Sequence, residues 1–197
     1  MNDRRIREAA RHKLFRRYAS TPDALVLEEV GVRHGAARID FLLVNGLLHG
    51  FELKSDKDTL RRLENQIPIY GSVLDRVTLV VGYRLADKAM AMIPDWWGVK
   101  LASSGQRGAI QFRDARTPKN NPGVQKEALA KLLWQEQALG VLKELGADAG
   151  VRSKTRREIY ARLAECADLD LIRTKVRYYL SQRRSHRVDE PQPTSVD

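Results

Sequence analysis

The fold is decided by residues 38–54, which read RIDFLLVNGLLHGFELK. Two apolar segments, 38–44 and 47–54, flank Asn45-Gly46, a dipeptide typical of tight turns between antiparallel strands. Another apolar segment, 24–32, precedes them and is separated from them by a second turn-like stretch, HGAA. The pattern therefore predicts a three-stranded meander.

Helical periodicity frames this meander on both sides. Apolar side chains recur at helical spacing through residues 6–17, which predicts an amphipathic helix that ends before residue 22. Beyond the meander the period lengthens from two to about 3.6, as in a helix. We therefore predict a helix over about 56–68, opened by a capping box between Ser55 and Asp58.

The next apolar stretch, residues 76–82 (RVTLVVG), is apolar on both faces, as in a covered central strand. The order helix, three strands, helix, strand indicates an α/β (α+β) fold with a mixed central sheet. We predict a core domain at 1–116, a basic C-terminal helical region at 124–187 and a disordered tail at 188–197. The remaining expected elements are a helix over 87–93, strands over 97–102 and 109–113, a polar linker over 117–123, one long helix over about 129–145, and two helices over about 155–166 and 170–184.

Composition narrows the function classes. The 197 residues include 35 Lys and Arg against 25 Asp and Glu, and the formal net charge is +10. The cations gather at 1–18 and 151–187, which favours contact with nucleic acid because neutralised phosphates release counterions; solubility alone is the alternative. The single cysteine, Cys166, excludes an internal disulfide and is expected to be a small buried residue. With no apolar stretch of membrane-spanning length and no secretory signal, we expect a cytoplasmic protein that does not contact membranes.

Charged residues enter the apolar strands of the meander. Because side chains alternate along a strand, Glu52 and Lys54 share one face of theirs. On the neighbouring strand Arg38 and Asp40 share a face, and Ile39, Phe41 and Leu43 are expected on the other. Buried charges are costly unless they are paired or bind a metal ion, so this cluster requires a compensating partner.

The loop between the two strands decides whether the two carboxylates meet. A two-residue turn at Asn45-Gly46 would pair Asp40 with Phe51 and put Asp40 and Glu52 on opposite faces. A three-residue loop, 44–46, would pair Leu43 with Leu47 and set Asp40 opposite Gly50. The carboxylates would then be diagonal neighbours, so we predict this bulged hairpin.

Two carboxylates with water oxygens are the ligands that Mg²⁺ prefers, and Mn²⁺ is an equivalent choice. The predicted metal ligands are Asp40 and Glu52. Lys54 is expected to orient the attacking water or stabilise an oxyanion, and Gln66 on the following helix to reach that water or a substrate phosphate. The sequence thus predicts hydrolysis of a phosphodiester.

The motif Asp40…Glu52-Leu53-Lys54 resembles that of the PD-(D/E)xK, restriction-endonuclease-like nuclease superfamily, with Ile39 in place of its proline. The stretches FELKSDKDTLRRLENQ, IPDWWG and LLWQEQAL resemble a mostly uncharacterised bacterial family of that type. The resemblance implies an αβββαβ core, metal ligation by Asp40 and Glu52, and catalysis by Lys54. It also implies that Gln66 is catalytic and that one further glutamate completes the site. The two alternatives for that glutamate are Glu8, as a catalytic residue, and Glu29, as a metal ligand.

The leading hypothesis is a Mg²⁺-dependent nuclease that acts on DNA in repair, recombination or defence. A homodimer is expected where two strands are cut, and Arg38 is a predicted DNA contact. The alternative is a non-catalytic DNA-binding protein whose C-terminal helix pair presents Arg173, Lys175 and Arg177. A pure interaction module, with neither activity nor DNA binding, is a further alternative.

Overall fold

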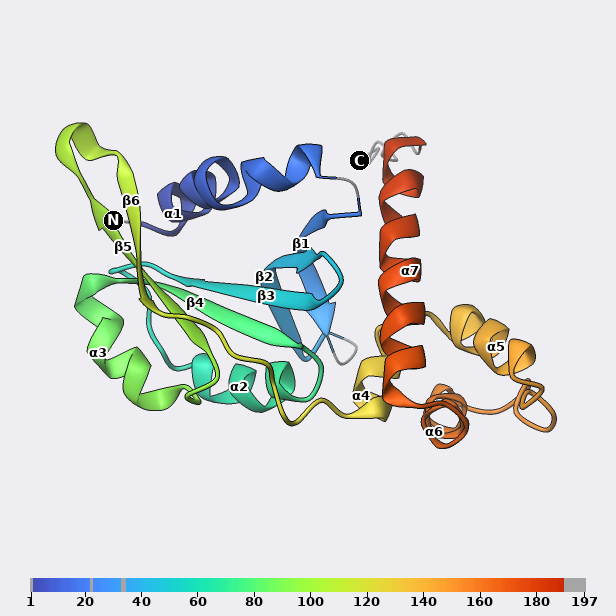
Figure 1. Ribbon diagram of the computed structural model, residues 1–197. Coiled ribbons are helices and arrows are strands. Elements are labelled where there is room, and N and C mark those ends of the chain that lie inside the picture. The colour runs from blue at the N-terminus through green and yellow to red at the C-terminus, as the bar shows by residue number, and fades with distance from the viewer. Residues whose placement is uncertain (1, 22, 33–34, 190–197) are drawn as a thin grey trace, which may run out of the picture.

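The computed structural model describes residues 2–21, 23–32 and 35–189, and it contains a six-stranded mixed sheet in the order β1-β2-β3-β4-β5-β6 (Figure 1). The first three strands pair antiparallel, as the meander requires, and β3-β4 and β4-β5 pair parallel. The last pair, β5-β6, is antiparallel. The α+β fold class predicted from the sequence is confirmed. The strands are β1 (Leu25–Val32), β2 (Ala37–Val44), β3 (Leu48–Lys54), β4 (Arg76–Gly82), β5 (Gly98–Ser104) and β6 (Ile110–Arg116).

Helices cover both faces of the sheet (Figure 1). The N-terminal α1 lies over one face, and the two crossover helices, α2 and α3, lie over the other. The C-terminal helices α4 to α7 gather beside the sheet, next to β1. The helices are α1 (Asp3–Ala10), which continues as a π turn (Arg11–Phe15) and a 3-10 turn (Arg16–Ser20), α2 (Leu63–Gly71), α3 (Tyr83–Met92), α4 (Lys126–Ala130), α5 (Gln135–Glu144), α6 (Arg156–Cys166) and α7 (Leu169–Asp189).

The sheet separates two hydrophobic clusters. The smaller lies under α1, where Ile6 and Ala10 pack on Phe41 and Phe51. The larger lies between the sheet and the other helices, and it includes residues of α4 to α7 as well as of α2 and α3. The C-terminal helices therefore share a core with the sheet.

The β2-β3 loop has three residues, as predicted, but it is shifted by one position. Val44 pairs with Leu48, so the loop is 45–47 rather than 44–46. Gly46 has φ +81°, a conformation that glycine adopts without steric cost, and Asn45 N donates to Leu47 O at 3.2 Å. The shift keeps the predicted relation of faces, but the expected Leu43–Leu47 pairing was wrong.

Alternation fails at one point of β1 and β2. Ile39 belongs to the larger cluster together with Leu42, whereas Phe41 belongs to the cluster under α1. Regular alternation would put Ile39 and Phe41 on the same face, as expected from the sequence. The regular β1-β2 pairing skips Glu29 opposite Asp40, and Glu29 has φ +55°. At this irregularity, beside the carboxylate of Asp40, the side chains of both strands exchange the faces on which they lie.

Two predicted helices have different bounds. The helix expected over 56–68 begins only at Leu63 and runs to Gly71. Asp58 accepts a hydrogen bond from Ser55 N at 2.5 Å, as in the predicted capping box, but residues 56–62 form turns rather than a helix. The long helix expected over 129–145 is interrupted between α4 and α5. There Trp134 N donates to Gln137 Oε1 at 2.9 Å, and the buried Tyr160 hydroxyl donates to Leu133 O at 2.8 Å.

The C-terminal half differs from expectation in three smaller respects. Residues 117–123 are hydrogen-bonded to the α2-β4 connection, where Asn121 Nδ2 donates to Gly71 O and Leu74 O at 2.7 Å each. Cys166 is exposed rather than buried. The last helix runs to Asp189, two residues into the predicted tail, and 190–197 lie outside the described residues. Among the helices that the structure describes, none has the length and apolarity needed to cross a bilayer.

Candidate active site

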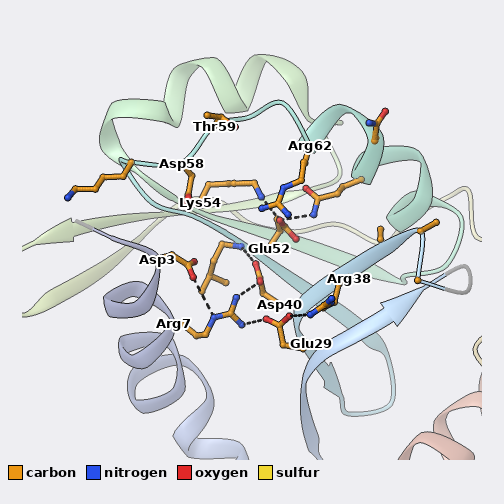
Figure 2. Close-up of a pocket in the computed structure, with 17 residues that line it drawn as sticks. Asp3, Arg7, Glu29, Arg38, Asp40, Glu52, Lys54, Asp58, Thr59 and Arg62 are labelled. Atoms are coloured by element: carbon orange, nitrogen blue, oxygen red, sulfur yellow. Dashed lines mark hydrogen bonds and ion pairs between the residues drawn. The ribbon is translucent and has the colours of Figure 1, made fainter. Parts of the chain in front are cut away.

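A cavity of about 800 Å³ opens where β2 and β3 separate. The pairing of these strands ends at Phe41–Phe51, while β3 stays paired with β4 as far as Lys54. The fork exposes Asp40 on one branch and Glu52 on the other, and the first turns of α1 and α2 complete the wall. Figure 2 shows their side chains around this space.

Glu52 is buried and held from three directions. Its Oε1 accepts from Lys54 Nζ at 2.5 Å and from Gln66 Nε2 at 2.8 Å. Its Oε2 lies 2.8 Å from the Tyr70 hydroxyl, whose single proton is shared between Oε2 and Arg38 O at 2.6 Å. Only 3% of the Glu52 side chain and 5% of the Lys54 side chain are exposed. Burial, followed by the negative charge of Glu52, raises the pKa of Tyr70 far above its ordinary value, so its hydroxyl remains a donor. These contacts fix the position of the carboxylate.

Asp40 faces Glu52 across the fork. Its Oδ2 accepts from Leu53 N at 2.7 Å. The carboxylate thus satisfies a main-chain N–H of β3 beyond the point where the β2-β3 pairing ends. Its Oδ1 accepts from Arg7 Nη2 at 2.5 Å. Burial, and then the charge of Glu52, raise the pKa of Asp40 to about 6, against the opposing effects of the Leu53 amide and Arg7. The two carboxylates therefore repel one another at neutral pH, a situation that a shared cation would relieve.

Arg7 was not predicted as part of the site. Figure 2 shows it between Asp40 and Glu29, with Nη1 2.5 Å from Glu29 Oε1. Burial of Ile6 and Ala10 fixes the rotation of α1 so that Arg7 faces the fork. Glu8, one position further round the helix, is exposed and does not line the cavity. Thus the structure brings the alternative, Glu29, to the cavity, and not Glu8.

Charges of both signs line the cavity: Lys54 and Arg7 lie beside Glu52 and Asp40 at its centre, and Asp3 and Glu29 are exposed at its rim. Five acidic and five basic side chains line it. The acidic Glu52 and Asp40 are buried or nearly so, with side-chain exposures of 3% and 16%. Exposed cations surround them: Arg38, which pairs with Glu29 at 3.1 Å, and also Lys57 and Arg62. The lining charges therefore balance in number, and the exposed cations at the rim are the ones open to an anion.

Comparison with known proteins places the chain in a family. Residues 3–190 match the family described as Bacteriophage P4 protein cII. The chain belongs to the phage P4 cII family. It is 34% identical over 91 residues to protein cII of Enterobacteria phage P4, and this match spans 46% of the chain and 34% of that relative's length.

Two solved structures are also similar to this cII-family chain. A Silicibacter pomeroyi protein of unknown function aligns with a TM-score of 0.38 and 18% identity, over 71% of this chain and 90% of that one. Pyrococcus furiosus SfsA, in complex with Ca²⁺, aligns with a TM-score of 0.37 and 16% identity, over 59% and 65% of the two chains.

The residues of the cII-family site fit a hard divalent cation held by two carboxylates and water. Asp40 and Glu52 supply oxygen ligands at one cavity, and Mg²⁺ commonly retains several waters beside one or two carboxylates. Gln66 Oε1, also at the cavity, is buried and has no hydrogen-bond partner within the described part of the chain. Across residues 2–21, 23–32 and 35–189, no group of three or more His, Cys, Asp or Glu is arranged to hold a metal ion. The fit of the site to a divalent cation therefore rests on the two carboxylates of Asp40 and Glu52.

The C-terminal cations predicted to contact DNA are engaged within the protein. Arg173 pairs with Asp75 at 2.8 Å and with Asp170 at 3.0 Å. Lys175 pairs with Glu144, and Arg177 donates to Gly46 O. In this cII-family chain the three cations fasten α7 to the sheet and to α5.

Proposed function

We propose that this protein is a divalent-cation-dependent nuclease that hydrolyses phosphodiester bonds of DNA. The proposal is carried by one observation: Asp40, Glu52 and Lys54 converge with Gln66 on a single cavity. The resemblance of Asp40…Glu52-Leu53-Lys54 to the PD-(D/E)xK motif supports it, since these residues lie on the second and third strands of an αβββαβ core.

Each residue then has a separate task. Asp40 and Glu52 would hold Mg²⁺ or Mn²⁺, and the bound ion would supply a water of lowered pKa and charge neutralisation at the phosphate. Tyr70 and Gln66 keep the Glu52 carboxylate in place through their bonds of 2.8 Å each. Lys54, whose ammonium is already fixed beside Glu52, donates a hydrogen bond to the water or to a phosphate oxygen.

The cavity rim, rather than the chain ends, is the proposed DNA contact. Arg38, Lys57 and Arg62 are exposed at this rim and are able to pair with backbone phosphates. Of the seven cations at 1–18, Arg11 and Lys13 are engaged within the protein, since Arg11 pairs with Glu28 and Lys13 donates to Ile110 O. Binding by phosphate contacts gives affinity without sequence preference.

Cleavage of linear, nicked, branched and single-stranded DNA with Mg²⁺ or Mn²⁺ tests the proposal. Asp40→Asn and Lys54→Met are expected to reduce the rate at least about 100-fold, as is typical for loss of a positioned catalytic group. Glu64→Gln is the matched control, because Glu64 is an exposed carboxylate on α2 that does not line the cavity. Equal rates in the wild type and all three variants would remove the proposal.

A further inference from the structure

The guanidinium of Arg7 occupies the space beside Asp40 where a ligated cation would have to lie. Nη2 is 2.5 Å from Asp40 Oδ1, and Nη1 is 2.5 Å from Glu29 Oε1 (Figure 2). The other Asp40 oxygen already accepts from Leu53 N. Both oxygens therefore already accept a hydrogen bond, and a cation at Oδ1 has to compete with the positive charge of Arg7.

The surroundings allow Arg7 to withdraw without unfolding. Its side chain is 17% exposed and lines the 800 Å³ cavity, so a change of rotamer that gives up its contacts with Asp3 (3.9 Å) and the Phe41 ring (5.6 Å to the centroid) moves the guanidinium toward the cavity. Nη1 makes no hydrogen bond of good geometry in spite of its closeness to Glu29. The helix itself stays in place, because Ile6 and Ala10 are fully buried beneath it.

A phosphodiester is the partner that would draw Arg7 away. A guanidinium presents paired N–H donors that match two phosphate oxygens, and such pairs are among the strongest hydrogen bonds in proteins. The exposed Arg38 and Arg62 at the same rim would hold the phosphate close to Arg7. The carboxylate that Arg7 leaves would then be without a counter-charge and ready to take a divalent cation.

We propose that Arg7 is an exchangeable gate, which blocks Asp40 in the free protein and transfers to a DNA phosphate when substrate binds, so that DNA and metal ion load together. The inference rests on the proposed function and deepens it. Coupling of this kind is reciprocal: DNA increases the affinity for the cation, and the cation increases the affinity for DNA. Removing the gate increases cation affinity in the absence of DNA and abolishes the coupling.

Binding of Mn²⁺ to the full chain, followed by the electron paramagnetic resonance signal of the free ion, tests this gate. Titrations are made with and without a short duplex of DNA, and with the same duplex carrying uncharged methylphosphonate linkages. For Arg7→Gln without DNA we expect an affinity increase of roughly tenfold, within the usual range of such couplings. The normal duplex should tighten Mn²⁺ binding to the wild type but not to Arg7→Gln. The methylphosphonate duplex should leave the Mn²⁺ affinity of both proteins unchanged.

Arg11→Gln is the matched control. Arg11 lies one turn after Arg7 and pairs with Glu28, the neighbour of Glu29 on β1, with its Nη2 2.5 Å from Glu28 Oε2. Unlike Arg7, it does not line the cavity. It loses the same charge and should bind Mn²⁺ as the wild type does. If Arg7→Gln does not fold, Arg7→Lys replaces it, since an ammonium cannot span both carboxylates, and its Mn²⁺ affinity should also rise.

The outcomes separate the gate from the nuclease. Equal Mn²⁺ affinity of the wild type and the Arg7 variant without DNA overturns the gate, while loss of binding in Asp40→Asn keeps the proposed function. If Asp40→Asn binds Mn²⁺ as tightly as the wild type, the cation lies elsewhere and both proposals fail.

Discussion

Replacing Lys54 by Met should destabilise the protein as well as inactivate it. The pair between Lys54 Nζ and Glu52 Oε1 is 2.5 Å long, and 5% and 3% of the two side chains are exposed. Removing one partner of a buried pair typically costs 3–5 kcal/mol, because it leaves an uncompensated charge. Glu52 keeps its bonds from Tyr70 and Gln66, so we expect the lower end, about 3 kcal/mol.

The double variant Glu52→Gln/Lys54→Met separates stability from chemistry. Replacing both charges by neutral groups of similar size is often neutral in stability, so the double variant should recover to within about 1 kcal/mol of the wild type. Cleavage should remain absent in the single and double variants alike. Urea unfolding measures the free energies, and the four proteins form a double-mutant cycle whose coupling energy should be large and favourable.

An exposed ion pair provides the control for this cycle. Lys100→Met removes a pair with Asp114, which joins β5 and β6 at 2.5 Å but leaves 68% of the Asp114 side chain exposed. We expect a cost below about 1 kcal/mol. The reasoning is refuted if Lys54→Met costs no more than Lys100→Met, or if the double variant is no more stable than Lys54→Met.

Three further perturbations test the surroundings of the site. Burial lowers the pKa of His49 from 6.5 to about 4, so on acidification the unfolded chain takes up this proton before the folded protein does. The free energy of unfolding should therefore fall by up to about 3 kcal/mol between pH 6.5 and 4. Parallel pH profiles of this free energy for the wild type and His49→Gln would contradict the prediction. Gly82→Ala would put a Cβ 2.3 Å from Asp56 Oδ1 and 2.9 Å from Asp56 N, so thermal unfolding should show a loss of about 1–3 kcal/mol, and an unchanged melting temperature would show that the Asp56 turn yields freely. Arg173→Gln removes the partner of Asp75, whose side chain is 6% exposed, so amide exchange in α7 should accelerate; unchanged exchange would mean that the pair does not hold the helix.

Strand alternation predicted much of the site, because it is a property of neighbouring residues. It placed Glu52 and Lys54 on one face, and Asp40 lines the same cavity as expected, although β2 departs from regular alternation at that residue. The exact pairing was missed by one loop position. Either three-residue loop preserves the faces, and the local sequence around Gly46 suits both.

Features that depend on distant contacts were not predictable in this way. The left-handed backbone of Glu29 is uncommon for a non-glycine residue and has no local signal. Arg7 meets Asp40 across 33 positions of sequence, and its helix periodicity indicates only that it adjoins the buried Ile6. The break before α5 depends on Tyr160, which reaches Leu133 from a later helix.

The hydrogen bonds of Asn121 join the segment after β6 directly to the part of the chain that carries the candidate site. Its amide is tied to the end of α2 and to the turn that follows, and α2 also carries Gln66 and Tyr70. A partner that displaced the helices α4, α5, α6 and α7 would also displace the segment after β6. Through Asn121 and α2, it would move Gln66 and Tyr70, the two side chains that position Glu52. Cutting the chain after residue 116 should therefore yield a fragment in which α2, and with it the contacts of Gln66 and Tyr70 to Glu52, is less firmly held.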